Sequence, residues 1–80
     1  MWDLAKELGK KIRLARKLRG ISQENLALMC RVDRSYMGRI ERGEANLTLE
    51  KLYQVARSLD CEPSALLPPP PPKAEIAVQH

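Results

Sequence analysis

This chain contains no phenylalanine, and aromatic residues make up only 4% of its 80 positions. Sheet sandwiches depend on aromatic and β-branched side chains, so a core of Leu, Ile, Val, Ala and Met favours packed helices. No stretch alternates apolar and polar residues with the period of two that a half-buried strand needs. A chain this short forms one small domain at most. The expected fold class is therefore all-α.

Cysteine and histidine are equally scarce, with Cys30, Cys61 and His80 as the only examples. A structural zinc site needs four such ligands in close pairs, so we expect no metal. We interpret both cysteines as reduced thiols of a cytoplasmic protein, with Cys30 as a small core residue, although a disulfide between them stays open. We find no signal peptide pattern and no run of about 18 apolar residues, which argues against a membrane span.

The residues for catalysis are missing too. The sequence offers no Ser-His-Asp set, no paired buried carboxylates and no glycine-rich phosphate loop. We therefore expect neither an enzyme nor a cofactor.

What the chain has in excess is positive charge in its first half. Residues 1–42 carry eleven Lys and Arg against five Asp and Glu, whereas residues 43–80 carry three against five. A basic half joined to a slightly acidic one is typical of a protein with one face toward a polyanion. A solvated surface rich in Lys and Arg gives the same totals, so charge alone leaves both interpretations open.

Within residues 1–67 the local signals predict five short helices. Gly20 ends a first helix that starts near Asp3, and Gly43 ends the third. N-cap residues or a proline suited to the first turn mark the other starts, at Ser22, Asp33, Thr48 and Pro63. Apolar residues recur at helical spacing and predict the core, namely Leu4, Leu8, Ile12, Ala15, Leu26, Ala27, Met29, Cys30, Met37, Ile40, Leu49, Leu52, Val55, Ala56 and Leu59.

Residues 68–80 form a separate proline-rich tail. The run from Pro68 to Pro72 lacks backbone donors and favours an extended polyproline path. We expect this tail to be flexible, and it is also a candidate docking peptide for a protein partner with an aromatic groove.

The second and third predicted helices are separated by about three residues, the spacing of a helix-turn-helix motif. In this motif the first helix braces the second, whose N-terminal part enters the DNA major groove. Ala27 is expected where the two helices cross closely. Arg34, Ser35, Gly38 and Arg39 are expected on the outward face of the second.

Several matched segments in register carry a resemblance to a known family, at residues 8–13, Arg16, residues 20–24, Leu26-Ala27, residues 34–43 and residues 46–49. The chain resembles the lambda-repressor-like helix-turn-helix family, and residues 33–43 are most similar to its restriction–modification controller proteins. The resemblance implies a compact five-helix DNA-binding domain over residues 1–67.

The resemblance also implies roles for particular residues. Arg34, Ser35 and Arg39 would face base edges, and Tyr36 would approach the backbone or a thymine methyl. Gln23, Arg42 and Asn46 would hold phosphates. Arg16 and Glu41 would form a structural ion pair between the first and third helices.

Two positions depart from the family pattern. Arg31 stands where glycine is usual, so a positive φ angle there would carry a modest cost, and Arg31 is alternatively an extra phosphate contact. Leu47 stands where proline is common.

One recognition helix reads too few base pairs for selectivity, so the family pairs two domains on half-sites about 34–36 Å apart. The expected function is a homodimeric, sequence-specific transcription regulator on a pseudo-palindromic operator, in the cytoplasm and associated with the nucleoid. The candidate dimer contacts are Tyr53, Leu59, Leu66 and Leu67. An antitoxin of a toxin–antitoxin pair and a protein-interaction adaptor that uses the tail remain as alternatives.

Overall fold

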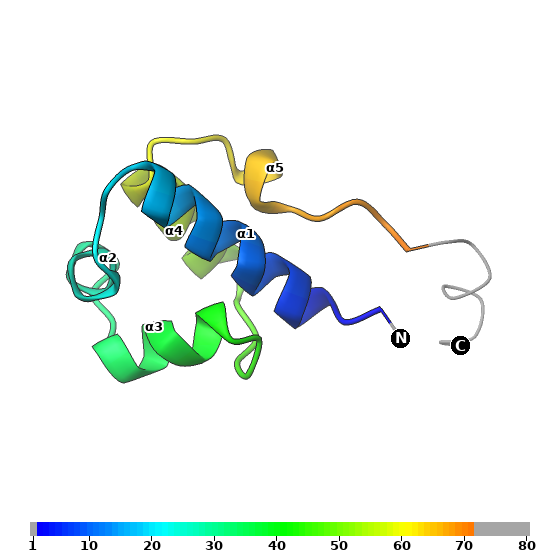
Figure 1. The fold of residues 1–80 in the computed structure, drawn as a ribbon, viewed down its shortest axis with the longest axis horizontal. Coiled ribbons are helices and arrows are strands. Elements are labelled where there is room, and N and C mark those ends of the chain that lie inside the picture. The colour runs from blue at the N-terminus through cyan, green and yellow to red at the C-terminus, as the bar shows by residue number, and fades with distance from the viewer. Residues whose placement is uncertain (1, 72–80) are drawn as a thin grey trace.

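The computed structural model describes residues 2–71 of the chain and folds them into helices, as Figure 1 shows. The elements are α1 (Leu4–Leu18), α2 (Gln23–Met29), α3 (Arg34–Glu41), α4 (Leu49–Ser58) and α5 (Pro63–Leu66). The all-α prediction with five helices is therefore confirmed over this range. We predicted that the proline-rich tail, residues 68–80, docks on a protein partner. From residue 72 onward the tail lies outside the described residues.

The helices start where the cap residues predict. The Ser22 hydroxyl accepts a hydrogen bond from the Asn25 amide at 3.0 Å, and the Thr48 hydroxyl accepts one from the Lys51 amide at 3.1 Å. Pro63 occupies the first turn of α5. Asp33 stands at the N-cap position of α3 as expected, but its side chain makes no capping hydrogen bond. The start of α3 is thus set by backbone geometry and packing.

Four helices end in the same way. After each of α1 to α4, one amide bonds a carbonyl five residues back and the preceding amide bonds one three residues back, which is the Schellman arrangement. The residue with positive φ at each end is Gly20, Arg31, Gly43 or Asp60. Arg31 has φ 56°, so a non-glycine residue in the turn between α2 and α3 adopts the positive φ for which we expected a modest cost.

The core gathers between all five helices. Fully buried apolar side chains come from every element, with Ile12, Leu26, Met37, Val55 and Leu66 as examples. Cys30 is buried among them, as predicted. Both cysteines are free thiols, so the alternative of a disulfide is excluded.

Three predicted core residues are instead exposed. Leu4 and Met29 are each 49% exposed, and Leu49 is 75% exposed. Leu4 and Leu49 are the first residues of α1 and α4, where the helix extends past its neighbours. Met29 is the last residue of α2, whose buried positions are Leu26 and Ala27. The apolar spacing thus predicted the correct buried face of each helix, but it extended that face too far toward the helix ends.

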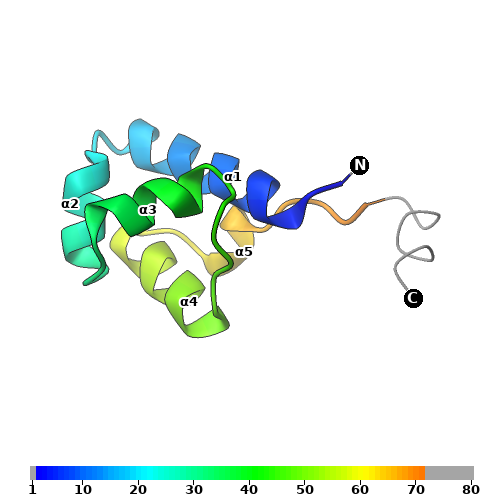
Figure 2. The same ribbon diagram turned by 90° about the horizontal axis from the view of Figure 1, so that it is seen from below.

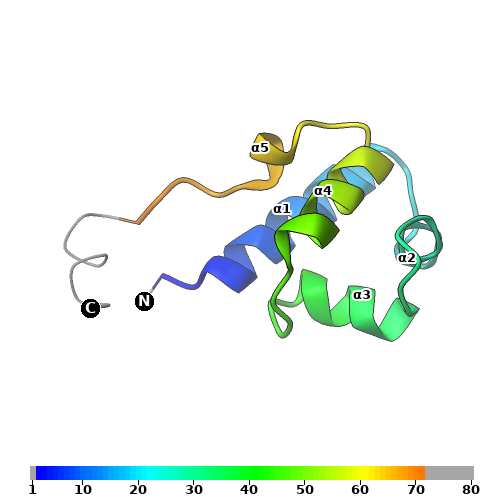
Figure 3. The same ribbon diagram turned by 180° about the vertical axis from the view of Figure 1, so that it is seen from behind.

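The arrangement leaves α3 at one edge of the molecule. Figures 1 and 3 show α3 and α5 at opposite edges, with α1 and α4 between them. Figure 2 shows α2 and α3 together at the end away from the chain termini. Helix α3 packs on α2 and α1, and α5 packs on α1 and α4. None of the helices within residues 2–71 is long and apolar enough to cross a membrane.

Gly9 allows α1 to approach the end of α3. A Cβ atom at this position would lie 2.5 Å from the Ile40 carbonyl oxygen and 2.6 Å from the Glu41 carbonyl oxygen. Both contacts are backbone atoms, which have no rotamer with which to move aside. Gly9 therefore sets how deeply α3 sits against α1.

We expect Gly9→Ala to destabilise the fold by about 3 kcal/mol, because the added methyl group must push the two helices apart. In an unobstructed helix the same change stabilises by about 1 kcal/mol, so the sign of the effect reports the contact. Urea unfolding measures it. Lys11→Ala, at an exposed position of the same helix, is the control and should shift the free energy of unfolding little. A stabilised Gly9→Ala variant would contradict the close contact.

Candidate nucleic-acid interface

The exposed edge of α3 is polar and basic. Arg34, Ser35 and Arg39 are all exposed, whereas Met37 and Ile40 are buried on the opposite side. Tyr36 is half-buried and packs against the core. An α-helix with its side chains is about 10–12 Å across, which fits the DNA major groove of about 12 Å width. The edge thus has the size and charge of a groove-reading element.

Two shallow hollows flank this edge. One is lined by Gln23, Arg34, Ser35, Gly38, Arg39 and Arg42. The other is lined by Arg31, Val32, Asp33, Ser35, Tyr36 and Arg39. Ser35 and Arg39 line both, so they form the ridge between the hollows. The structure thus brings together all of the predicted DNA-facing residues except Asn46, which is exposed but lines neither hollow.

Gly38 lies on the outward face of α3, as its position in the helix predicted, because it lines the first hollow, but it is buried. The cause is a pair of long side chains that lie against it. A Cβ atom at Gly38 would lie 3.0 Å from Nη1 of Arg42 and 3.4 Å from Oε1 of Gln23. Glycine here leaves room for both side chains at the floor of the first hollow.

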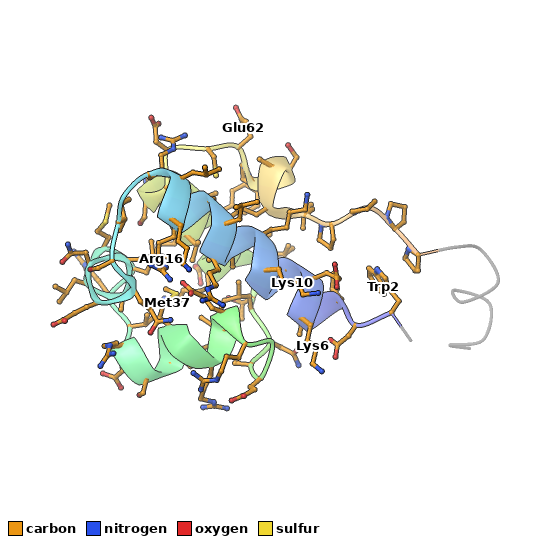
Figure 4. The ribbon with its side chains drawn as sticks, viewed as in Figure 1. Trp2, Lys6, Lys10, Arg16, Met37 and Glu62 are labelled. Carbon is orange, nitrogen blue, oxygen red and sulfur yellow. The ribbon has the colours of Figure 1, made fainter. Side chains whose placement is uncertain are left out.

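A buried ion pair joins α1 to the end of α3, as the resemblance implied. Nε of Arg16 donates to Oε2 of Glu41 at 2.7 Å, and Nη2 donates to Oε1 at 3.0 Å. The side chains are only 11% and 3% exposed. Arg16 also donates through Nη1 to the Ile21 carbonyl at 3.0 Å, just before α2. Figure 4 shows Arg16 and Met37 in the space between α1 and α3.

Gln23 is connected to this pair. Its Nε2 donates to Oε1 of Glu41 at 3.2 Å, so the first residue of α2 is tied to the last residue of α3. This hydrogen bond was not predictable from the sequence, because the two residues are eighteen positions apart.

Arg42 is paired with Glu44, a residue that sequence reasoning did not single out. Nε and Nη2 of Arg42 donate to the two carboxylate oxygens at 3.1 and 3.2 Å. The hydrogen bond from Arg42 lowers the pKa of Glu44 below its ordinary value of 4.5, and the same bond raises the pKa of Arg42. The pair therefore stays ionised above pH 4.5 and is lost only as the pH falls through the lowered pKa of Glu44.

The predicted dimer contacts divide into two groups. Leu59 and Leu66 are each 1% exposed within their own chain, so neither has surface to offer a partner, and the prediction is wrong for both. Tyr53 is 62% and Leu67 is 48% exposed. Consecutive Leu66 and Leu67 point in different directions, and only Leu67 is available. A broad hollow between α4 and α5, lined in part by Tyr53, lies on this side of the molecule.

Comparison with known proteins adds to this geometry. The model of a helix-turn-helix family matches residues 12–66. Control protein C.BamHI of Bacillus amyloliquefaciens is 37% identical over 60 residues, which cover 74% of each chain. Control protein C.SmaI of Serratia marcescens is 35% identical over 65 residues, covering 81% of this chain and 77% of the relative.

A solved structure shows the same fold at similar identity. The restriction-modification controller protein C.AhdI from Aeromonas hydrophila superimposes with a TM-score of 0.76 and 40% identity. The superposition covers 79% of this chain and 96% of that one. The helix arrangement is thus shared with a protein of nearly the same extent.

We expect Glu41→Gln to destabilise the fold by about 3–5 kcal/mol, because it leaves the charge of Arg16 buried and unpaired. Replacing both partners, Arg16→Met with Glu41→Leu, should recover most of this loss. Thermal and urea unfolding measure both. Glu44→Gln, which breaks the exposed pair with Arg42, is the control and should leave the unfolding midpoint nearly unchanged. Equal effects of Glu41→Gln and Glu44→Gln would contradict a special role of the buried pair.

Proposed function

Because the chain belongs to the helix-turn-helix family of DNA-binding transcription regulators, we propose that it reads a pseudo-palindromic operator as a homodimer. The observation that carries this proposal is the exposed basic edge of α3, flanked by a hollow that three arginines and Gln23 line. The similarity to a restriction-modification controller protein supports a comparable controlling role in the cell, beside DNA in the cytoplasm.

The residues proposed to contact bases directly lie on the exposed edge of α3. Arg34 and Arg39 are exposed and carry the planar guanidinium group that bonds O6 and N7 of guanine in pairs. Ser35 is short enough to let the helix approach, and it both donates and accepts hydrogen bonds. Tyr36 is partly held by the core, so its phenol is directed by packing toward the backbone or a thymine methyl.

Phosphate contacts fall to the residues beside the ridge. Gln23 and Arg42 both lie against Gly38, and Asn46 follows in the loop after α3. In the free protein Glu44 already occupies two donors of Arg42, so a phosphate must compete with this carboxylate. Such competition weakens binding to every DNA sequence by the same factor, since a phosphate contact carries no base information.

The dimer contact falls to the surface around Tyr53 and Leu67. Both side chains are large, apolar in part and exposed. Tyr53 belongs to α4, and Leu67 ends α5, the helix at the edge opposite α3 in Figure 1. Pairing two copies through this surface leaves α3 of each free for DNA.

Selection of bound sequences from random duplexes tests the proposal. We expect a symmetric motif from the wild type, with half-sites one helical turn apart. Arg39→Ala should relax the motif at one position per half-site, a discrimination of about 1–3 kcal/mol. Arg42→Ala should instead weaken all sequences evenly and reduce the salt slope by about 0.9 per copy. Enrichment of no motif by the wild type would overturn the proposal.

The dimer has its own test. We expect Leu67→Arg to yield a folded monomer, because it places a charge in the contact without touching the core. Losing simultaneous contact with two half-sites should weaken operator binding by about 10²–10⁴-fold. Sedimentation and DNA titration measure these effects. Leu18→Arg changes a leucine that is 77% exposed on α1, and this control should remain dimeric. Unchanged sedimentation of Leu67→Arg would remove Leu67 from the interface.

A further inference from the structure

The carboxylate of Glu41 has more partners than an ion pair needs. Its Oε1 accepts from Nη2 of Arg16 at 3.0 Å and also from Nε2 of Gln23 at 3.2 Å. The Glu41 side chain is only 3% exposed, so water competes little for these bonds. Gln23 is itself half-buried at the start of α2 and lines the first hollow beside the exposed edge of α3. One side chain thus belongs both to the core network and to the proposed DNA surface.

This bond decides which way the Gln23 carboxamide points. A carboxylate only accepts hydrogen bonds, so the amide must turn its nitrogen, and not its oxygen, toward Glu41. The amide nitrogen carries two N–H groups, and Glu41 takes one of them. The amide plane then fixes the direction of the second. Oε1 of Gln23 is turned toward Gly38, where any side chain would lie within 3.4 Å of it.

We propose that Glu41 is a positioning residue for DNA binding, which holds the Gln23 amide so that its second N–H is ready for a backbone phosphate. This inference rests on the proposed function and adds a role to a residue that is too buried to touch DNA. Without Glu41 the amide turns freely and presents its oxygen to the phosphate as often as its nitrogen. Preorganisation also spares the ordering of a long side chain on binding.

A double-mutant cycle separates this role from the contribution of Glu41 to the fold. The backgrounds are the wild type and the variant Arg16→Met with Glu41→Leu. In this variant apolar residues replace both charges, so no unpaired charge is left in the core. Gln23→Ala is introduced into each. The probe is a mixed-sequence duplex of about 20 base pairs, which spans two half-sites, at low salt. A phosphate contact is independent of sequence, so no operator is needed.

We expect Gln23→Ala to weaken binding by about tenfold in the wild type, the effect of one hydrogen bond to a charged group. In the apolar background the same change should weaken binding by no more than about twofold, since the amide is no longer aligned. The salt slope should stay constant in both, because glutamine carries no charge.

Arg34→Ala in the two backgrounds is the matched control. It should weaken binding by the same factor in each, since Arg34 has no bond to the buried pair. Suppose that Arg34→Ala lowers the DNA affinity equally in the two backgrounds, whereas Gln23→Ala lowers it unequally. This result shows that α3 stays in place while Gln23 loses its orientation. Equal losses for Gln23 in both backgrounds, or no loss in the wild type, would overturn the inference. Absence of any binding by the wild type would instead overturn the proposed function.

A second measurement covers the case in which the apolar variant does not fold. Side-chain relaxation of the Gln23 amide in the DNA-free wild type should show an order parameter above about 0.6, the value that separates rigid from flexible groups. The amide of Gln54, half-buried on α4, provides an internal comparison. An order parameter of the Gln23 amide below about 0.6 would overturn the inference.

Discussion

The buried pair of Arg16 and Glu41 is the interaction on which the placement of the recognition helix depends. One guanidinium group contacts the last residue of α3 through two bonds and the Ile21 carbonyl just before α2 through a third. Helices α1, α2 and α3 are thereby joined at one point by directional bonds. Apolar packing alone allows small shifts of one helix on another, because dispersion contacts have little directionality. A bidentate bond between planar groups allows few.

The pair works only because the backbones come close. Because Gly9 has no side chain, α1 comes close to the carbonyl groups of Ile40 and Glu41. A methyl group at position 9 would clash with both. Met37 and Ile40 then fill the space between α3 and the rest of the core. A charged pair in such a small core is costly to desolvate, so its directional bonds contribute to the orientation of α3 more than to net stability. The recognition edge needs orientation, since a base contact tolerates little displacement.

Much of this was predictable from the sequence, and the failures have physical causes. Caps, glycines and apolar spacing predict all five helices because these signals are local. Leu59 was predicted both in the core and at the dimer contact, and its burial confirms only the first. The burial of Leu66 was not predictable, since a helix period does not say which of two consecutive apolar residues the other helices cover. Gly38 was assigned to the right face, but its burial was missed for a related reason. Its burial comes from long side chains of Gln23 and Arg42, which fold over it from different parts of the chain. Contacts between distant positions leave no mark on a single sequence.

The electrostatics of the proposed DNA surface follow from two carboxylates in different surroundings. Glu41 is enclosed, so its charge is matched by Arg16 and its remaining capacity serves Gln23. Glu44 is open to water, and its bond to Arg42 exchanges readily with a phosphate because both partners stay solvated. The buried acid therefore fixes a neutral donor in advance, whereas the exposed acid holds a charged donor only until a stronger anion arrives. Both acids thereby act on proposed phosphate contacts, which position the protein on DNA, and discrimination between DNA sites is left to the base contacts proposed for Arg34 and Arg39.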